Sequence, residues 1–271
     1  MITLIAIDLD GTLLNHQKEI PADNIQAIQE ATAEKIKIVL CTGRPSSGTK
    51  PYFDQLGLQE DEFLILNNGC STYSSLEWKL IHSHSLNLQD ISDLYDLCKD
   101  YPGVYLTLTA EDNYYVLGDA VPELVQADGD LVFTQVKAIT IADLASSQEV
   151  VFQAMYMGVE SILDGFEEAY ALELSEKYSL VRSQDYILEV MPQNVTKAYA
   201  LQELAKDLNC SPEEIMAIGD APNDIEMLSF AGLGVAMGNA SPAIKKLADK
   251  VTADCDHAGV AKAIREFALK G

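Results

Sequence analysis

The chain has 271 residues, of which 48% are apolar, and this length suits one large or two ordinary domains with a real core. Its formal net charge of −24 gives a strongly acidic surface that repels nucleic acid and anionic membranes, so neither is an expected partner. The same field repels a phosphorylated substrate, which would need local cations at its binding site.

The cysteines and the N-terminus predict a cytoplasmic protein. The five cysteines are odd in number, widely spaced and without a C-x-x-C pair, which indicates reduced thiols. The N-terminus shows no pattern of a secretory leader, and no segment approaches the roughly 18–20 apolar residues that cross a bilayer. The sequence carries no signal for the oligomeric state.

The first third of the chain predicts a parallel sheet. An apolar run over residues 4–7 predicts a buried strand, and Asp8 follows it at once. The next predicted elements are a helix over 22–34, a strand over 36–40, a helix over 49–56 and a strand over 63–66. Strand, helix and strand in this order indicate right-handed crossover units, whose strands end where ligands bind in doubly wound sheets.

The pattern changes in the middle of the chain and then returns. Between residues 85 and 189, β-rich runs at 104–109, 114–117, 150–157 and 186–190 alternate with helical stretches near 91–98 and 162–172. Several runs alternate polar with apolar residues, which favours an antiparallel sheet in a separate α+β module. The α/β pattern resumes with helices over 198–208 and 223–231, strands over 215–218 and 233–237, a helix opened by Ser241, a strand near Val251 and a helix from Val260.

Asp8 and Asp10 stand at the end of the first predicted strand. An ionised carboxylate beside an apolar run costs several kcal/mol unless a cation or hydrogen-bond donors meet it. Gly11 permits a turn that redirects Asp10, and a solvated strand end is the simpler alternative. A calcium loop is excluded, because Leu13 stands where such a loop needs glycine and a strand precedes it.

Three further features belong with this strand end. Thr42-Gly43-Arg44 offers a hydroxyl and free N–H groups after the second predicted strand, with an ordinary strand-to-helix turn as the alternative. The run over 43–50 is not a Walker loop, because Thr49 precedes Lys50. Lys197 stands near a helix start, where a cation costs about 0.3–1 kcal/mol unless it faces an anion, and a solvated surface lysine is the simpler alternative for this residue taken alone. Asp220 and Asp224 follow a second buried strand. Together these features indicate a metal-assisted phosphate site.

These residues resemble the four motifs of the haloacid dehalogenase superfamily, and within it the Cof-type sugar phosphatases. Residues 8–13 are similar to the first motif, 42–45 to the second, Lys197 to the third and 219–224 to the fourth. The chain departs from the family pattern at the periphery: Ala198 stands in place of glycine, Cys70 in place of alanine, and residues 254–259 lack the usual asparagine and acid-Asp-Gly run.

The resemblance implies a fold and a function. It implies a doubly wound parallel Rossmann-like sheet core formed by residues 1–84 and 190–271, with an inserted α+β cap at 85–189 that sets substrate specificity. It also implies a Mg²⁺-dependent phosphatase of small phosphorylated metabolites, with sugar phosphates as the expected substrates. A phosphomutase with the same chemistry and a catalytically silent, acidic Mg²⁺-binding module are the alternatives.

The resemblance further implies a role for each motif residue. Asp8 would attack phosphorus to form an aspartyl-phosphate, and Asp10 would protonate the leaving alcohol and then activate water. Mg²⁺ would be held by Asp8, Asp220 and the backbone carbonyl of Asp10, with Asp224 orienting this group. The remaining assignments are phosphoryl binding by Leu9, Thr42, Gly43, Asn223 and Lys197, and substrate or cap contacts by Arg44 and Asn68.

Overall fold

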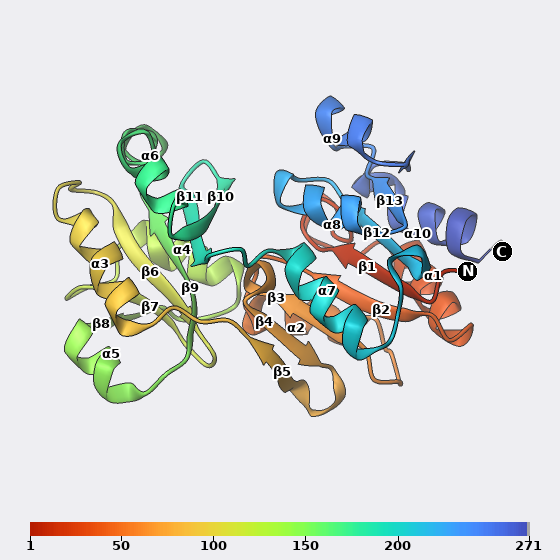
Figure 1. Ribbon diagram of the computed structural model, residues 1–271, viewed down its shortest axis with the longest axis horizontal. Helices are drawn as coiled ribbons and strands as arrows, with labels where there is room; N and C mark the ends of the chain where they lie inside the picture. Colours follow the sequence, from red (N-terminus) through yellow and green to blue (C-terminus); the bar gives the residue numbers. More distant parts are fainter. Residues whose placement is uncertain (270–271) are drawn as a thin grey trace. The chain divides into compact units, whose positions relative to one another are not determined.

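The computed structural model describes residues 1–269, which divide into two compact units (Figure 1). The first unit contains residues 1–43 and 49–82 and the chain from Thr196 onward, and the second contains residues 44–48 and 83–195. The predicted core runs to residue 271, and its last two residues lie outside the described part of the chain.

The first unit is built on an eight-stranded sheet with the order β14-β13-β12-β1-β2-β3-β4-β5. The strands are β1 (Leu4–Asp8), β2 (Lys37–Cys41), β3 (Phe63–Leu66), β4 (Ser71–Ser74), β5 (Lys79–Ser83), β12 (Ile215–Gly219), β13 (Leu233–Ala236) and β14 (Lys250–Val251). The pairs from β14 to β3 are parallel, and β4 runs antiparallel to β3. Because β1 has parallel neighbours on both sides, its residues are almost wholly apolar.

Helices cover both faces of this sheet. Ile5 and Ile7 point to one face and pack with residues of α1 (Ala22–Ala33), α2 (Ser46–Gln55) and α10 (Gly259–Ala263). Leu4 and Ala6 point to the other face, against α7 (Lys197–Asp207), α8 (Ile225–Phe230) and α9 (Pro242–Leu247). Successive side chains of a strand alternate between faces, so one short strand builds two cores.

The second unit has a six-stranded sheet with the order β10-β11-β9-β6-β7-β8. The elements are β6 (Tyr105–Ala110), β7 (Tyr114–Leu117), β8 (Lys137–Ile139), β9 (Val151–Met157), β10 (Tyr178–Gln184) and β11 (Ile187–Pro192), with α3 (Leu88–Cys98), α4 (Glu123–Leu131), α5 (Ile141–Ser147) and α6 (Glu160–Ser175). Helices α3 and α6 pack on one face through Leu94 and Phe166, and α4 packs on the other through Val125.

The α/β fold class is confirmed, and several elements differ from the expectation. Helix α2 begins at Ser46 rather than near residue 49, although it contains Gly48 and Pro51. In the second unit, β8 pairs parallel with β7, whereas the sequence predicted an antiparallel sheet. Strands β4, β5, β8 and β10 and helices α4 and α5 were not predicted, because their short and partly polar segments lack a clear period.

A search of residues 1–269 for a membrane-spanning helix finds none that is long and apolar enough.

Glu62 is a buried carboxyl that ties β2 to the start of β3. It is 1% exposed and accepts a hydrogen bond from the backbone N–H of Ile38 at 2.6 Å. Burial raises the pKa of Glu62 to about 7, although the Ile38 N–H and Lys37 oppose this shift. The folded protein therefore holds a proton that the unfolded chain releases at lower pH, so this group's contribution to stability is lost as pH rises toward about 7.

We expect Glu62→Gln to raise the melting temperature at pH 8 by several degrees, because the neutral amide oxygen still accepts from Ile38. The gain over the native protein should grow between pH 4.5 and 7 and then level off, as measured by thermal unfolding across this range. Glu168→Gln, at an exposed position of α6 in the second unit, is the control and should show no such trend. A gain independent of pH would contradict the assignment.

Candidate active site

The predicted site lies where parallel strands of the first unit end side by side. β1 ends at Asp8, β2 is followed by Thr42, and β12 ends at Gly219 just before Asp220. β1 pairs in parallel with both β2 and β12, so these three strand ends meet at one edge of the sheet. In open α/β sheets this edge is where ligands bind.

Lys197 joins two acids at the centre of this edge. Its Nζ donates to Asp8 Oδ1 at 2.6 Å and to Asp224 Oδ1 at 2.8 Å, and the lysine side chain is only 1% exposed. Lys197 is the first residue of α7, where the helix dipole disfavours a cation. The two carboxylates offset that cost, and removing the lysine would leave two buried carboxylates without a cation, at a cost of several kcal/mol.

Asp224 stabilises the loop after β12 by hydrogen bonds to the backbone of that loop. Asp224 Oδ2 accepts from the backbone N–H groups of Asp220 and Ala221, both at 3.0 Å. Asp220 Oδ1 accepts from the Thr12 hydroxyl at 2.9 Å, which links the β12 loop to the loop after β1. Gly11 allows this approach, because a Cβ there would lie 2.6 Å from Asp220 Oδ2 and its φ is +78°. Each oxygen of Asp224 is therefore used inside the protein.

The acids of the site carry shifted pKa values. Burial raises the pKa of Asp8 well above its ordinary range, and the charge of Asp224 adds to this while Lys197 opposes it. Burial and then the charge of Asp224 raise the pKa of Asp220 to about 6. Burial alone would lower the pKa of Lys197, but the charges of Asp224 and Asp8 outweigh it and raise that pKa. The cluster thus carries more negative charge than its own lysine balances.

The same cluster fits a divalent cation. Asp8, Asp220 and Asp224 each offer a carboxylate oxygen, and these oxygens lie within 4.8 Å of one another. Asp8 Oδ2 is buried and has no hydrogen-bond partner among residues 1–269. Three carboxylates against the one ammonium of Lys197 leave two negative charges in excess. Oxygen ligands and an excess of this size suit a hard divalent ion such as Mg²⁺.

Asp10 stands apart from this buried cluster. Its Oδ1 accepts from Lys18 Nζ at 2.6 Å, with side chains 34% and 50% exposed respectively. An ion pair this exposed contributes only about 0–1 kcal/mol. The two acids of the first motif, Asp8 and Asp10, therefore meet different partners in different surroundings.

Asn68, Asn223 and the loop after β2 lie together. Asn223 Nδ2 donates to Asn68 Oδ1 at 3.0 Å, and the Asn68 N–H donates to the Thr42 carbonyl at 3.0 Å. A Cβ on Gly43 would approach Asn68 Nδ2 to 3.0 Å. Asn68 has a φ of +53°, within a left-handed turn that ends at Gly69. Thr42, Gly43, Asn68 and Asn223 thus converge, as a phosphate-binding loop would need.

Leu9 and Arg44 take less central places. Leu9 is fully buried, so only its backbone can face a ligand. Arg44 belongs to the second unit, where its guanidinium donates to the carbonyls of Leu131 at 3.2 Å and Gly48 at 3.4 Å.

Sequence reasoning assigned no role to Thr12, Lys18 or Asn239, which all contact the acids. Asn239 Nδ2 donates to Asp220 Oδ2 at 3.0 Å and to the Gly11 carbonyl at 2.8 Å. Its position gave a usable signal, because Asn239 follows the end of β13 and so lies at the same sheet edge as the other residues. The contacts of Thr12 and Lys18 depend on loop conformation, which residue spacing does not specify.

Comparison with known proteins links the chain to one family. The family model described as haloacid dehalogenase-like hydrolase matches residues 5–264. The chain is 32% identical over 268 residues to the 5-amino-6-(5-phospho-D-ribitylamino)uracil phosphatase YcsE of Bacillus subtilis (strain 168), with 99% of this chain and 96% of YcsE covered.

Solved structures agree with this match. A haloacid dehalogenase-like hydrolase from Bacteroides thetaiotaomicron has a TM-score of 0.87 and 30% identity, with 98% of this chain and 99% of that chain covered. A sugar phosphatase of HAD subclass IIB, BT4131, has a TM-score of 0.81 and 26% identity, with 98% of this chain and 99% of that chain covered. The similarity therefore extends over nearly the whole chain.

The pKa of Asp220 predicts how cation binding depends on pH. Because a cation must displace the proton of this carboxyl, affinity for Mg²⁺ should fall about tenfold or more per pH unit below pH 6. Isothermal titration calorimetry between pH 5 and 8 measures this change. Asp54→Asn, at an exposed position of α2, is the control and should follow the native curve. Equal affinities at pH 5 and 7 would contradict the assignment.

Proposed function

Since this chain belongs to the haloacid dehalogenase-like hydrolase family, we propose that it is a Mg²⁺-dependent phosphatase of small phosphorylated metabolites that acts through an aspartyl-phosphate. The observation that carries the proposal is the Asp8 carboxylate, whose Oδ1 is held by buried Lys197 while its buried Oδ2 has no partner among the described residues. This oxygen is the group that would attack phosphorus. The substrate class follows the names of YcsE and BT4131.

Mg²⁺ would be held by Asp8, Asp220 and the backbone carbonyl of Asp10, with Asp224 orienting the group. The hydrogen bonds of Asp224 support this assignment of ligands, because both of its oxygens already accept from Lys197 or from two backbone N–H groups. When bound, the ion would neutralise the charge of the acids and of the phosphoryl oxygens. Lys197 adds a second positive charge, which an anionic substrate needs at an acidic protein.

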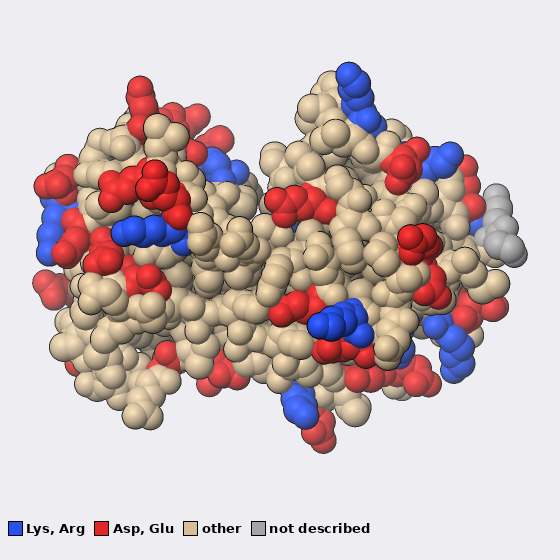
Figure 2. Space-filling model, in the orientation of Figure 1, with Lys and Arg blue, Asp and Glu red and all other residues tan. Residues whose placement is uncertain are grey.

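The acidic surface of the protein explains why a phosphorylated substrate would need these positive charges at the site. Figure 2 shows acidic side chains on the visible face of both units, with lysine and arginine side chains scattered among them. A phosphorylated metabolite is repelled by the net charge of −24 until it reaches the cations of the site. Thr42, Asn223, and the backbone N–H groups of Leu9 and Gly43 would hold the phosphoryl oxygens there.

In the first step Asp8 would form a bond to phosphorus while the bond from phosphorus to the leaving oxygen breaks. The carboxyl proton of Asp10 would pass to that oxygen, so the alcohol leaves neutral. In the second step Asp10 would take a proton from water as the water oxygen attacks phosphorus, and the bond to Asp8 would break. The pair with Lys18 is exposed and weak, so a substrate could displace it from Asp10 at little cost before the first step.

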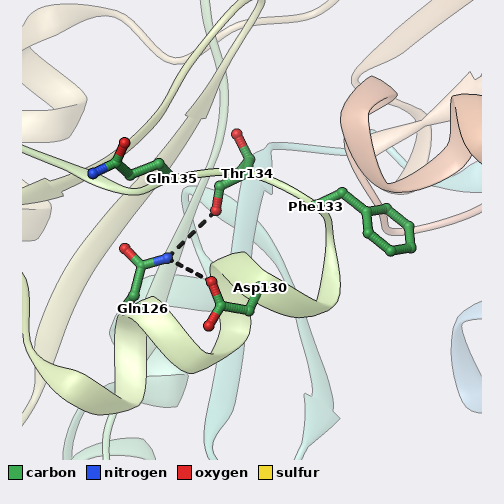
Figure 3. A pocket seen from close by; sticks show the side chains of 5 residues that line it. All are labelled: Gln126, Asp130, Phe133, Thr134 and Gln135. Carbon is green, nitrogen blue, oxygen red and sulfur yellow. Dashed lines mark hydrogen bonds between the residues drawn. The ribbon is translucent and has the colours of Figure 1, made fainter.

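We assign residues 85–189 as the cap that selects the leaving group. A pocket of about 520 Å³ in this part of the chain supports the assignment (Figure 3). The Gln126 amide in its wall donates to Asp130 at 2.8 Å, and the Phe133 ring is turned away from this pair (Figure 3). Amide and carboxylate groups of this kind bind hydroxyl-rich molecules such as sugars. The free thiols of all five cysteines support the proposed cytoplasmic location.

Asp8→Asn tests the chemistry. We expect the native protein to release phosphate from an aryl phosphate with Mg²⁺ and not with a chelator, and the variant to lose at least about 10³-fold in kcat because it lacks the nucleophile. Asp54→Asn is the matched control on the surface and should retain activity.

Three results would contradict this reaction. Turnover that survives Asp8→Asn would exclude Asp8 as the nucleophile, and absence of turnover would favour a silent Mg²⁺-binding module. Transfer of phosphate to form a bisphosphate, without net release, would identify a phosphomutase.

A cap exchange tests the source of specificity. Replacing residues 83–195, which contain the proposed cap and keep β11 whole, with the matching segment of a relative that prefers another substrate should reorder turnover across a panel of sugar phosphates, because the cap would supply the contacts to the leaving group. Turnover of an aryl phosphate by the chimera is the control for an intact core. An unchanged ranking in an active chimera would place specificity in the core instead.

A further inference from the structure

We propose that His16, Cys255 and Asp256 form a second cation site, suited to a divalent ion of the Zn²⁺ class. His16 Nδ1, Cys255 Sγ and a carboxylate oxygen of Asp256 lie within 4.8 Å of one another. All three residues belong to the first unit, and none takes part in the proposed phosphatase chemistry. The site therefore stands whether or not the proposed function is correct.

The ligands come from two segments that the fold brings together. His16 lies in the loop between β1 and α1, and Cys255 and Asp256 lie in a short 3₁₀ turn over Cys255–His257, some 240 residues later. The His16 backbone N–H donates to Asp256 Oδ1 at 3.1 Å, and its ring Nδ1 lies 2.7 Å from Asp256 Oδ2. The backbone contact would keep the two segments together when the ring turns to a cation.

Cys255 is held in place by a separate contact. Its N–H donates to Asn239 Oδ1 at 3.0 Å, and its side chain is buried, with Sγ 3.7 Å from His16 Nδ1. Asn239 in turn donates to Asp220, so it links the backbone of Cys255 to the loop after β12. A ligand set held by its backbone before the ion arrives loses less entropy on binding.

The type of ligand decides the type of ion. One imidazole nitrogen, one thiolate and one carboxylate form a mixed set that suits Zn²⁺ and its neighbours, with water in the fourth position. Mg²⁺ avoids sulfur and takes oxygen ligands, such as those of Asp8, Asp220 and Asp224. The two clusters should therefore bind different ions, and the net charge of −24 favours cations at both.

The distances are close to those of a tetrahedral site. Zn²⁺ bonds of about 2.0–2.3 Å place neighbouring ligand atoms roughly 3.3–3.7 Å apart. The separation of Cys255 Sγ and His16 Nδ1, 3.7 Å, already agrees. The 2.7 Å between His16 Nδ1 and Asp256 Oδ2 is that of a hydrogen bond and must widen by about half an ångström. Both side chains are exposed, at 68% and 41%, and can move this far.

Binding has a defined proton balance. The Cys255 thiol would release its proton to solvent and bind as the thiolate. His16 would bind through Nδ1 as the neutral imidazole with its proton on Nε2, so bonds from His16 and Asp256 to the ion replace the hydrogen bond between them. No bond other than those to the ion forms, and no residue changes its oxidation state.

Co²⁺ is the probe, because a bond to thiolate gives a charge-transfer band in the near ultraviolet that oxygen ligands do not give. We expect the native protein, titrated with Co²⁺ in the presence of excess Mg²⁺, to develop this band and to lose it when Zn²⁺ is added. Cys255→Ser should abolish the band, and His16→Gln should weaken Co²⁺ binding by about tenfold or more. Cys210→Ser is the matched control and should keep the band.

His16 is exposed, so His16→Gln should fold normally, and circular dichroism with thermal unfolding checks each variant. Absence of the band in the native protein would overturn the site and identify the contact between His16 and Asp256 as a structural clamp alone. A band that persists in Cys255→Ser, or that disappears in Cys210→Ser, would also overturn it. None of these results depends on phosphate release, so they remain separate from tests of the phosphatase.

Discussion

The buried ammonium of Lys197 is the interaction on which the rest of the first unit's site depends. It holds Asp8 at the end of β1 and Asp224 in the loop after β12, two segments more than two hundred residues apart in the chain. Asp224 then fixes the backbone of Asp220, and Thr12 ties Asp220 to the loop after β1. One buried cation thus organises a ring of contacts that closes across neighbouring parallel strands.

The acidic cluster carries more negative charge than Lys197 neutralises, and this excess destabilises the folded protein. Burial and mutual repulsion raise the pKa values of Asp8 and Asp220, which means that the folded protein holds these acids at a cost to its stability. Such a conflict between stability and local charge is common where a protein binds a ligand. A divalent cation would relieve the conflict, and the contacts of Asn239 show that the acids are supported from the β13 side as well.

The elements that the sequence predicted well are those with a strong period or a continuous apolar run. β1, β3 and β12 were found almost to the residue, because strands buried on both faces are apolar throughout. Helix α2 was placed too late, because Gly48 and Pro51 are residues that usually interrupt helices. β4 and β8 were missed because a short strand gains its stability from its neighbours in the sheet, which a local pattern does not record.

The sequence by itself determined which residues end the buried strands, and so predicted that Asp8, Thr42 and Asp220 would meet, since parallel strands end at one edge of a sheet. Together with the acidic strand ends, the position of Lys197 near a helix start also indicated that its ammonium faces an anion. Only the tertiary structure decided which atoms pair: Lys18 with Asp10, Asn239 with Asp220, and His16 with Cys255 and Asp256. These contacts join loops whose conformations depend on packing against distant segments, and residue spacing carries no record of that packing.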